Sequence, residues 1–367
     1  MSHPQPTAGT PEPVAAAGPR PALDKKKTII GAVIGVVALA VIFLRVIPQI
    51  GSYEDAWIAI QGMNAFDVAL IVMAVVVYNG VYGFPFMAAV PGLAYPRSFQ
   101  LNQGAFAISN GIPAGGAFGL GVQYAMLASY AVPPTVATAA IGATGVWSIF
   151  VTLGLPVFGV MAIAASGTIS ASQYVGIGVV GLVTLVAMVV AFALVMRSEP
   201  LAVRLGGWAT SAARPLFRLL KKDAPDLVPL VVGFRSDTVE LVSRRWHVIT
   251  VSQVAVSLCQ FAIFFVALRG VEGAGTPTSF LVAFGAWAVA QIGIMIPLTP
   301  GGLGTVDAFM ISLLTAMGVS TGDATAATLV WRAASFVPQI AIGVLALASW
   351  SRHAARTFAA TTAPERL

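Results

Sequence analysis

The stretch "PLTPGGLGTVDAFM", residues 297–310, places two prolines, three glycines and the carboxylate of Asp307 directly after a long apolar run. Prolines and closely spaced glycines interrupt a helix. In a bilayer, irregular backbone is tolerated only where protein or a water-filled cavity surrounds it, because lipid cannot hydrogen-bond to peptide groups. The stretch therefore predicts a broken membrane helix with its break inside the protein. The backbone breaks fall at Pro300, Gly301, Gly302 and Gly304.

The composition indicates an integral membrane protein. The chain has 367 residues, of which 57% are hydrophobic and 9% charged, whereas a soluble domain carries about 25% charged residues. Its net charge of +6 comes from basic residues clustered between apolar runs, which indicates membrane orientation and not nucleic-acid binding. The single cysteine, Cys259, excludes an intramolecular disulfide, and the three histidines are widely spaced. We expect no metal site and no cofactor.

The charge pattern predicts an all-α, polytopic protein with about seven to nine membrane segments. The amino-terminal lysines and the arginine-rich segment 197–246 are typical of the cytoplasmic side. We expect a multi-pass protein of the inner cell membrane with a cytoplasmic N-terminus. Its predicted parts are a disordered tail (1–27), a first membrane half (28–196), a basic cytoplasmic segment (197–246), a second membrane half (247–350) and a tail (351–367).

The uncharged segment between Arg97 and Arg197 predicts a re-entrant element. Polar breaks divide it into pieces at about 98–131, 135–165 and 174–196. Both ends carry cytoplasmic signals, so the chain must cross an even number of times, and three pieces satisfy this only if one enters and leaves on the same side. The piece with backbone breaks at Pro113, Gly115 and Gly116 is the natural candidate.

Hydrophobic periodicity predicts further helices outside that segment. They cover about 68–90, 248–268, 277–298 and 324–350, and an amphipathic interfacial helix begins near residue 201 and is interrupted at Pro215. Residues 305–318 form only a short apolar piece. Fourteen helical residues reach about 21 Å, less than the hydrocarbon core of about 30 Å. This piece is therefore a half-helix or one limb of a broken crossing.

The two broken segments resemble each other. "IPAGGAFGLGVQYAML" (112–127) and "TPGGLGTVDAFMI" (299–311) share a proline, paired glycines and a following short apolar helix, which indicates two weak internal repeats. Gly/Pro-interrupted segments in corresponding positions of two halves point to a central binding site. The alternative is close helix packing through small residues. Asn110 is a strong polar side chain beside the first break.

Arg332 is the strongest single indication of a site. It lies nine residues after Asp323 in an apolar helix, which places it near mid-bilayer, where an arginine costs from about 3 to more than 10 kcal/mol unless it finds a partner. Asp307 is the acidic residue of the neighbouring embedded segment, so we expect the two side chains to meet. Such a pair leaves donors for a phosphate. The alternative is a buried ion pair that only fixes helix packing.

These motifs resemble a known family. "PLTPGGLGTVDAFMISLLTAMGVSTGDATAATLVWR" (297–332) is similar to the signature of the lysylphosphatidylglycerol synthase transmembrane region, a flippase-like domain, and "SNGIPAGGAFGLGVQYAML" (109–127) is similar to its first-half motif. The resemblance covers roughly residues 28–350 and implies a role in translocating phospholipids or lipid-linked glycans. Two departures are Asp307, where glutamate is usual, and Gly119, Gly121 and Gln123, where many members carry a charge. No soluble aminoacyl-transferase domain follows, so lipid synthesis is not expected.

The sequence thus predicts a flippase-like protein that translocates, or helps to translocate, an anionic phospholipid or lipid-linked substrate between leaflets. Arg332 would neutralise the phosphate, with Asp307 and Asn110 completing the substrate-binding site, and no catalytic residues are expected. No GxxxxGK[ST] motif is present in the sequence. One alternative is a non-transporting accessory or anchor protein for a lipid-modifying enzyme. An intramembrane transferase is a weaker one, because embedded histidine and glutamate are lacking.

Overall fold

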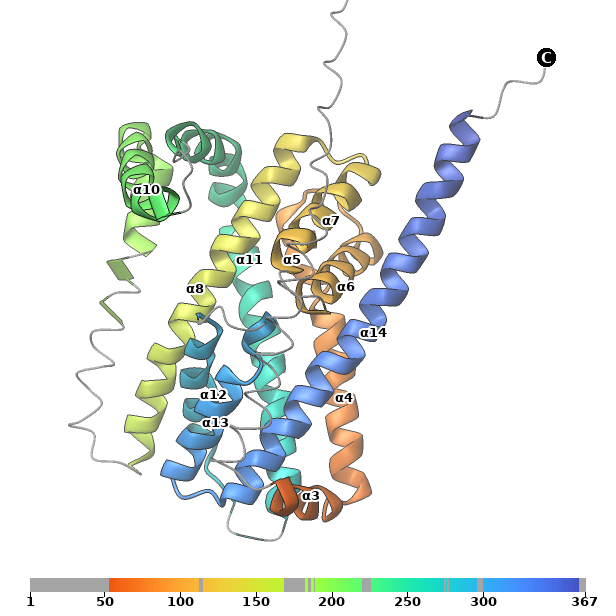
Figure 1. The fold of residues 1–367 in the computed structure, drawn as a ribbon, viewed down its shortest axis with the longest axis vertical. Helices are drawn as coiled ribbons and strands as arrows, with labels where there is room; N and C mark the ends of the chain where they lie inside the picture. Colours follow the sequence, from red (N-terminus) through yellow and green to blue (C-terminus); the bar gives the residue numbers. More distant parts are fainter. Residues whose placement is uncertain are drawn as a thin grey trace, which may run out of the picture.

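The computed structural model describes residues 53–362, apart from 112–114, 168–181, 184–185, 188, 220–225, 274, 276 and 296–299. Every regular element in the described residues is helical (Figure 1), which confirms the all-α prediction. The elements are α3 (Tyr53–Gln61), α4 (Ala65–Val81), α5 (Phe84–Ala89), α6 (Tyr95–Gly111), α7 (Gly115–Ser129), α8 (Pro134–Ser166), α10 (Glu199–Leu219), α11 (Val228–Glu272), α12 (Phe280–Ala290), η2 (Gln291–Met295), η3 (Pro300–Gly302), α13 (Thr305–Ala316) and α14 (Thr321–Thr362). Further helical residues lie between 182 and 197.

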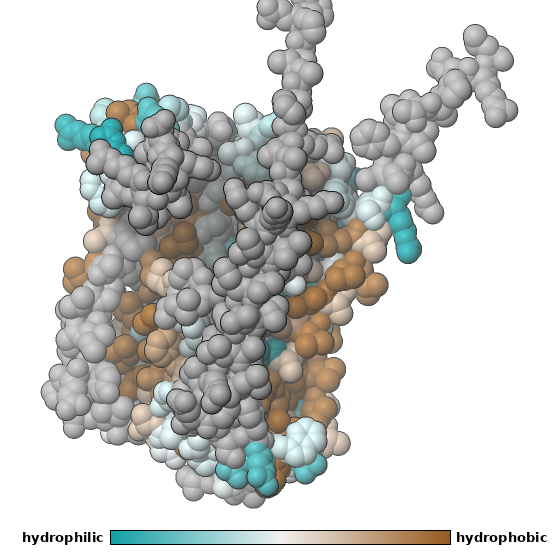
Figure 2. All heavy atoms as spheres, viewed as in Figure 1, coloured by the Kyte–Doolittle hydropathy of each residue, from teal (hydrophilic) through white to brown (hydrophobic). Residues whose placement is uncertain are grey.

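Apolar helices form the body of the molecule. Within the described residues, four stretches are long and apolar enough to cross a membrane, namely Ala65–Ala89, Pro134–Ser166, Thr238–Glu272 and Thr321–Arg352. Phe280–Met295 and Thr305–Ala316 are shorter apolar helices. Hydrophobic side chains occupy the middle of the face seen in Figure 2, and hydrophilic ones gather at its upper and lower ends. Exposed apolar side chains between polar ends are what a lipid-embedded protein requires.

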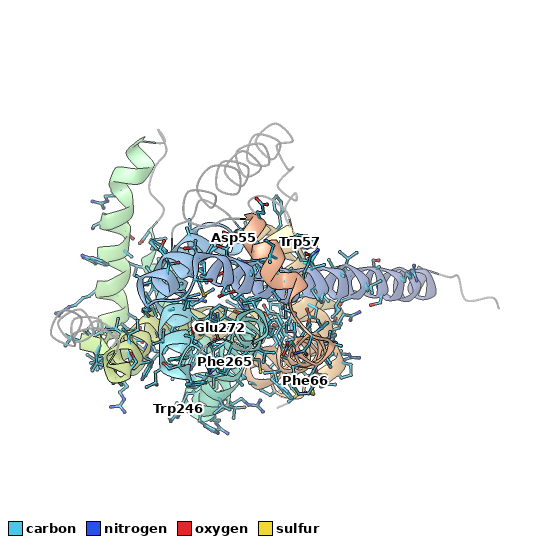
Figure 3. The ribbon with its side chains drawn as sticks, turned by 90° about the horizontal axis from the view of Figure 1, so that it is seen from below. Asp55, Trp57, Phe66, Trp246, Phe265 and Glu272 are labelled. Atoms are coloured by element: carbon cyan, nitrogen blue, oxygen red, sulfur yellow. The ribbon has the colours of Figure 1, made fainter. Side chains whose placement is uncertain are left out.

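The two ends of the molecule differ in charge. At the lower end of Figure 1, α3, the start of α14 and the end of α11 lie together, and Figure 3 views this end directly with Asp55 and Glu272 labelled. At the upper end, Arg245 of α11 donates to the carbonyl of Ala88 at 3.1 Å, and α10 carries Arg204 and Arg214. The acidic and basic ends therefore lie on opposite sides of the apolar band.

Two helical hairpins enter this body from opposite ends. α6 and α7 form the upper hairpin (Figure 1), with its open ends joined by a hydrogen bond of 2.6 Å from Tyr130 Oη to Gln100 Oε1. α12 and α13 form the lower one. The segment predicted to be re-entrant corresponds to the α6–α7 hairpin, whose two limbs begin and end on the same side of the molecule. The proline expected at its break, Pro113, lies outside the described residues.

The helix expected at 68–90 corresponds to the apolar stretch Ala65–Ala89, which has a short irregularity at Tyr82 and Gly83, although both residues keep αR backbone angles. Gly83 packs closely on Tyr95, whose ring would lie 2.6 Å from an added Cβ. Two other helix predictions are corrected. The helix expected at 277–298 ends at Ala290 and continues as a 3-10 helix, since Gly293 packs against the backbone of Val306 too closely for a side chain. The interruption expected at Pro215 is absent, and α10 runs continuously to Leu219. Pro215 removes one backbone hydrogen-bond donor from α10 without ending the helix.

One helix crosses the expected boundary between the basic segment and the second membrane half. α11 runs without interruption from Val228 to Glu272, through residues 246 and 247. Its upper part packs against α10 and its lower part against α4 and α8. The basic segment is therefore continuous with the membrane body through one rigid helix.

Candidate functional site

Asp307 and Arg332 meet inside the protein, as the sequence predicted. The Asp307 Oδ1 atom accepts hydrogen bonds from Arg332 Nη2 at 2.7 Å and from Arg332 Nε at 2.9 Å. The two residues are 2% and 8% exposed, so the ion pair is screened from water and lipid. Removing one partner of such a pair leaves an uncompensated buried charge.

The broken backbone positions Asp307. Gly304 has a φ of +84°, a left-handed conformation that side chains other than glycine rarely adopt, and α13 begins at the next residue. The Asp307 Oδ2 atom accepts a hydrogen bond of 2.6 Å from the Gly304 amide, so one carboxylate oxygen caps the helix start and the other holds Arg332. A carboxylate is also favoured at this helix end by the helix dipole. Asp307 therefore caps α13 and pairs with Arg332 at the same time.

Aromatic rings flank the Arg332 guanidinium. Its Cζ atom lies 4.5 Å from the ring centroid of Trp331 and 4.9 Å from that of Phe336, which are cation–π distances. Both bonds to Asp307 use Nε and Nη2, and among the described residues Nη1 has no bonded acceptor. The buried Trp331 Nε1 atom likewise lacks a partner within the described chain. The site thus retains N–H groups from which a phosphate could accept hydrogen bonds.

The two hairpins meet beside this pair. A Cβ added to Gly301 would lie 2.7 Å from Asn110 Oδ1 at the end of α6 and 2.8 Å from Phe336 Cζ. Gly301 also has a φ of +63°, so its place requires glycine for two reasons. Phe336 therefore contacts Arg332 on one side and the second break on the other, and Asn110 and Gly301 belong to the same neighbourhood as Arg332.

The remaining predicted breaks have different surroundings. Gly302 has a φ of +66°, and Pro300 lies in η3 with its side chain outside the description. Gly115 forms the tight return of α6 into α7, since a Cβ there would lie 2.1 Å from the carbonyl oxygen of Ile108. No atom of the described residues lies within 4 Å of a Cβ added to Gly116. Of the described residues of the two breaks, those of the second lie beside Asp307 and Arg332.

Sequence reasoning missed a buried polar stripe on α14. Its members are Thr325, Thr328, Arg332, Ser335 and Gln339, each no more than 8% exposed. Their spacing of three and four residues is that of one helix face, so periodicity could have found them. Gln339 Oε1 accepts a hydrogen bond of 2.9 Å from Tyr78 Oη, which accepts one of 2.8 Å from Gln260 Nε2. The membrane body therefore contains a polar core two helical turns from Arg332.

The described residues contain no group of three or more His, Cys, Asp or Glu side chains placed to hold a metal ion. The buried polar groups of the described core are instead the Asp307–Arg332 ion pair and several side-chain amides and hydroxyls. Such groups bind and orient a ligand by hydrogen bonding and charge.

The fold and the site together define a class: an all-helical, multi-pass membrane protein in which two opposed broken hairpins meet at a buried charged pair. The chain belongs to the lysylphosphatidylglycerol synthase TM region family, a model of which matches residues 28–343. It is also similar to a UPF0104 membrane protein of Methanothermobacter thermautotrophicus (strain Delta H), with 45% identity over 73 residues. That match covers 20% of this chain and 22% of the relative. Membership of this family is consistent with a lipid-related role in the membrane.

Proposed function

We propose that this protein translocates an anionic phospholipid or lipid-linked substrate between membrane leaflets, with Arg332 neutralising its phosphate. The observation that carries the proposal is a buried arginine whose Nη1 atom is unbonded within the described chain, beside the meeting point of two broken hairpins. An unbonded donor on a buried cation favours an anionic ligand. Broken helices around a mid-membrane site are typical of transporters.

A purely structural ion pair is the competing interpretation. Asp307 offers Arg332 only one oxygen, because its other oxygen is bonded to the Gly304 amide. The pair is therefore not the two-oxygen, fork-to-fork arrangement that would use the guanidinium most fully. A site built only for stability would gain from the second contact. We therefore favour a binding role for Arg332.

Leaflet exchange of labelled phosphatidylglycerol in vesicles containing the purified protein tests the proposal. The double variant Asp307→Asn/Arg332→Gln removes both charges but keeps similar shapes and the helix cap. We expect the wild type to exchange the lipid and the double variant to fall to the rate of protein-free vesicles, since the phosphate loses its counter-charge. Equal exchange by both proteins would contradict a role for Arg332. A folded wild type that exchanges no anionic lipid would favour the accessory-protein alternative.

We further propose that the basic end of the molecule faces the cytoplasm, since basic residues concentrate on that side of membrane proteins. In a Cys259→Ala background, single cysteines at Ser320 and Ser351 report on opposite ends, and both positions are exposed. An impermeant maleimide added to intact cells is expected to label Ser320→Cys and to spare Ser351→Cys until the membrane is opened. The reverse pattern would overturn this orientation.

A further inference from the structure

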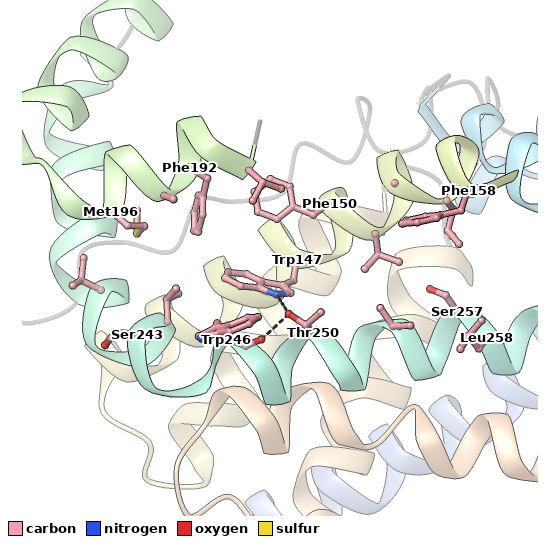
Figure 4. Close-up of a pocket in the computed structure, with 18 of the residues that line it drawn as sticks. Trp147, Phe150, Phe158, Phe192, Met196, Ser243, Trp246, Thr250, Ser257 and Leu258 are labelled. Atoms are coloured by element: carbon pink, nitrogen blue, oxygen red, sulfur yellow. Dashed lines mark hydrogen bonds between the residues drawn. The ribbon is translucent and has the colours of Figure 1, made fainter. Parts of the chain in front are cut away.

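A large groove lies on the side of the molecule, separate from the Asp307–Arg332 pair. It has a volume of about 920 Å³ and runs between α8, the helical residues 189–197 and α11 (Figure 4). Neither Asp307 nor Arg332 lines it. Its walls are mainly aromatic and aliphatic, with Trp147, Phe150, Phe158, Phe192, Trp246 and Leu258 among them.

The few hydroxyl groups in the wall are already bonded. Thr250 Oγ1 donates to the carbonyl of Trp246 at 2.7 Å and accepts from Trp147 Nε1 at 2.7 Å, as the dashed lines in Figure 4 show. Ser257 Oγ donates to the carbonyl of Gln253 at 3.1 Å. A polar ligand would find few hydrogen-bond partners along this wall, whereas a hydrocarbon chain has no hydrogen bonds to lose there. The chemistry of the groove fits an apolar occupant.

One end of the groove is cationic. Arg197 and Ser243 line it at the basic end of the molecule, and the opposite end is formed by apolar residues such as Phe284. The structure shows no carboxylate of the described chain paired with Arg197. A single unpaired guanidinium at the rim of an apolar groove is complementary to a molecule with one anionic head and a long apolar tail.

The length of the groove also matches such a molecule. From Ser243 to Leu258, α11 advances fifteen residues, or about 22 Å. One leaflet contributes half of a hydrocarbon core of about 30 Å, or about 15 Å. An acyl chain that begins at the basic end would therefore lie in the groove for the full depth of its own leaflet.

We propose that this groove holds an acyl chain of an anionic glycerophospholipid from the leaflet at the basic end, with the head-group phosphate bound by Arg197. This site is distinct from the Arg332 site and does not rest on the proposed transport. A protein that moved no lipid would still bind one here.

Native mass spectrometry of the purified full-length protein tests this inference, with phosphatidylglycerol and phosphatidylcholine supplied in equal amounts. We expect wild type to retain phosphatidylglycerol preferentially. Arg197→Gln should weaken that retention about tenfold, the size of one lost charged hydrogen bond. Arg204→Gln, which removes an exposed arginine outside the groove, should leave retention unchanged.

A second pair of variants tests the acyl-chain position. Ala193 lines the groove and Ala191 is an exposed neighbour outside it, so Ala193→Trp should displace the lipid and Ala191→Trp should not. Unchanged melting temperatures in detergent would show that each variant is folded. Equal retention of both lipids by wild type, or retention that survives both Arg197→Gln and Ala193→Trp, would overturn the proposal and leave ordinary boundary lipid as the occupant.

Discussion

Arg332→Ala is expected to destabilise the protein by about 3–5 kcal/mol, because it leaves the buried Asp307 carboxylate without its counter-charge. Asp307 is 2% exposed, and its Oδ1 atom accepts its two bonds from Arg332. The loss should appear as a lower melting temperature of the purified protein in detergent. Arg204→Ala, at an exposed arginine of α10, is the matched control and should change stability by less than about 1 kcal/mol.

A double-mutant cycle separates the pair from other effects. The cycle compares the single variants Asp307→Asn and Arg332→Gln with the double variant that carries both. The double variant should be more stable than Arg332→Gln alone, since it leaves no unpaired charge. The coupling energy between the two sites should be clearly different from zero. If the single substitutions are each tolerated and their effects simply add, the two charges do not interact in the folded protein. The same double variant separates stability from transport, because it should be folded but inactive in leaflet exchange.

The Asp307–Arg332 contact was predictable because lipid leaves a buried charge few options. A central arginine must face protein or water and find an acceptor, and the neighbouring embedded segment supplied a single carboxylate. The free-energy cost of an unpaired arginine in the membrane and the single carboxylate nearby together identified the partner from the sequence alone. The broken hairpins followed from similar reasoning, since proline and glycine runs deep in a bilayer must be enclosed by protein.

The contacts that sequence could not supply depend on residues far apart in the chain. The bonds of Tyr78 to Gln339 and Gln260 join α4, α14 and α11, and no local pattern specifies which amide finds which hydroxyl. The close packing of Gly83 on Tyr95 and of Gly293 on Val306 likewise joins residues that no local pattern pairs. Phe336, in contrast, lies four residues after Arg332 and on the same helix face, so its contact with the guanidinium could have been expected.

The polar residues of the core include neutral side chains as well as the charged pair. Sequence reasoning concentrated on charged residues and breaks, although α14 turns several neutral polar side chains inward. In a soluble protein the buried face of a helix is usually the more apolar one, but in a membrane protein the buried face can be the more polar one. Periodicity of Thr, Ser and Gln in apolar helices is therefore as informative here as periodicity of Leu is in soluble proteins.

Gly301→Ala is expected to destabilise the protein by about 2–4 kcal/mol and to lower leaflet exchange. The backbone at Gly301 is left-handed, and an added Cβ would lie 2.7 Å from Asn110 Oδ1 and 2.8 Å from Phe336 Cζ. Because Phe336 also faces the Arg332 guanidinium, displacement of its ring disturbs the charged pair. Melting in detergent and exchange of labelled phosphatidylglycerol measure the two effects.

Gly116→Ala is the matched control, since it adds the same methyl group in the other hairpin, where no atom of the described residues lies within 4 Å. It should leave both stability and exchange close to wild type. Adding Asn110→Ala to Gly301→Ala should recover part of the lost stability, because it removes the nearer of the two clashing atoms, while the strained φ and the Phe336 contact remain. If Asn110→Ala gives no recovery, or if Gly116→Ala is as damaging as Gly301→Ala, the two hairpins do not meet at this contact, and the site around Arg332 would have to be built from the lower hairpin alone.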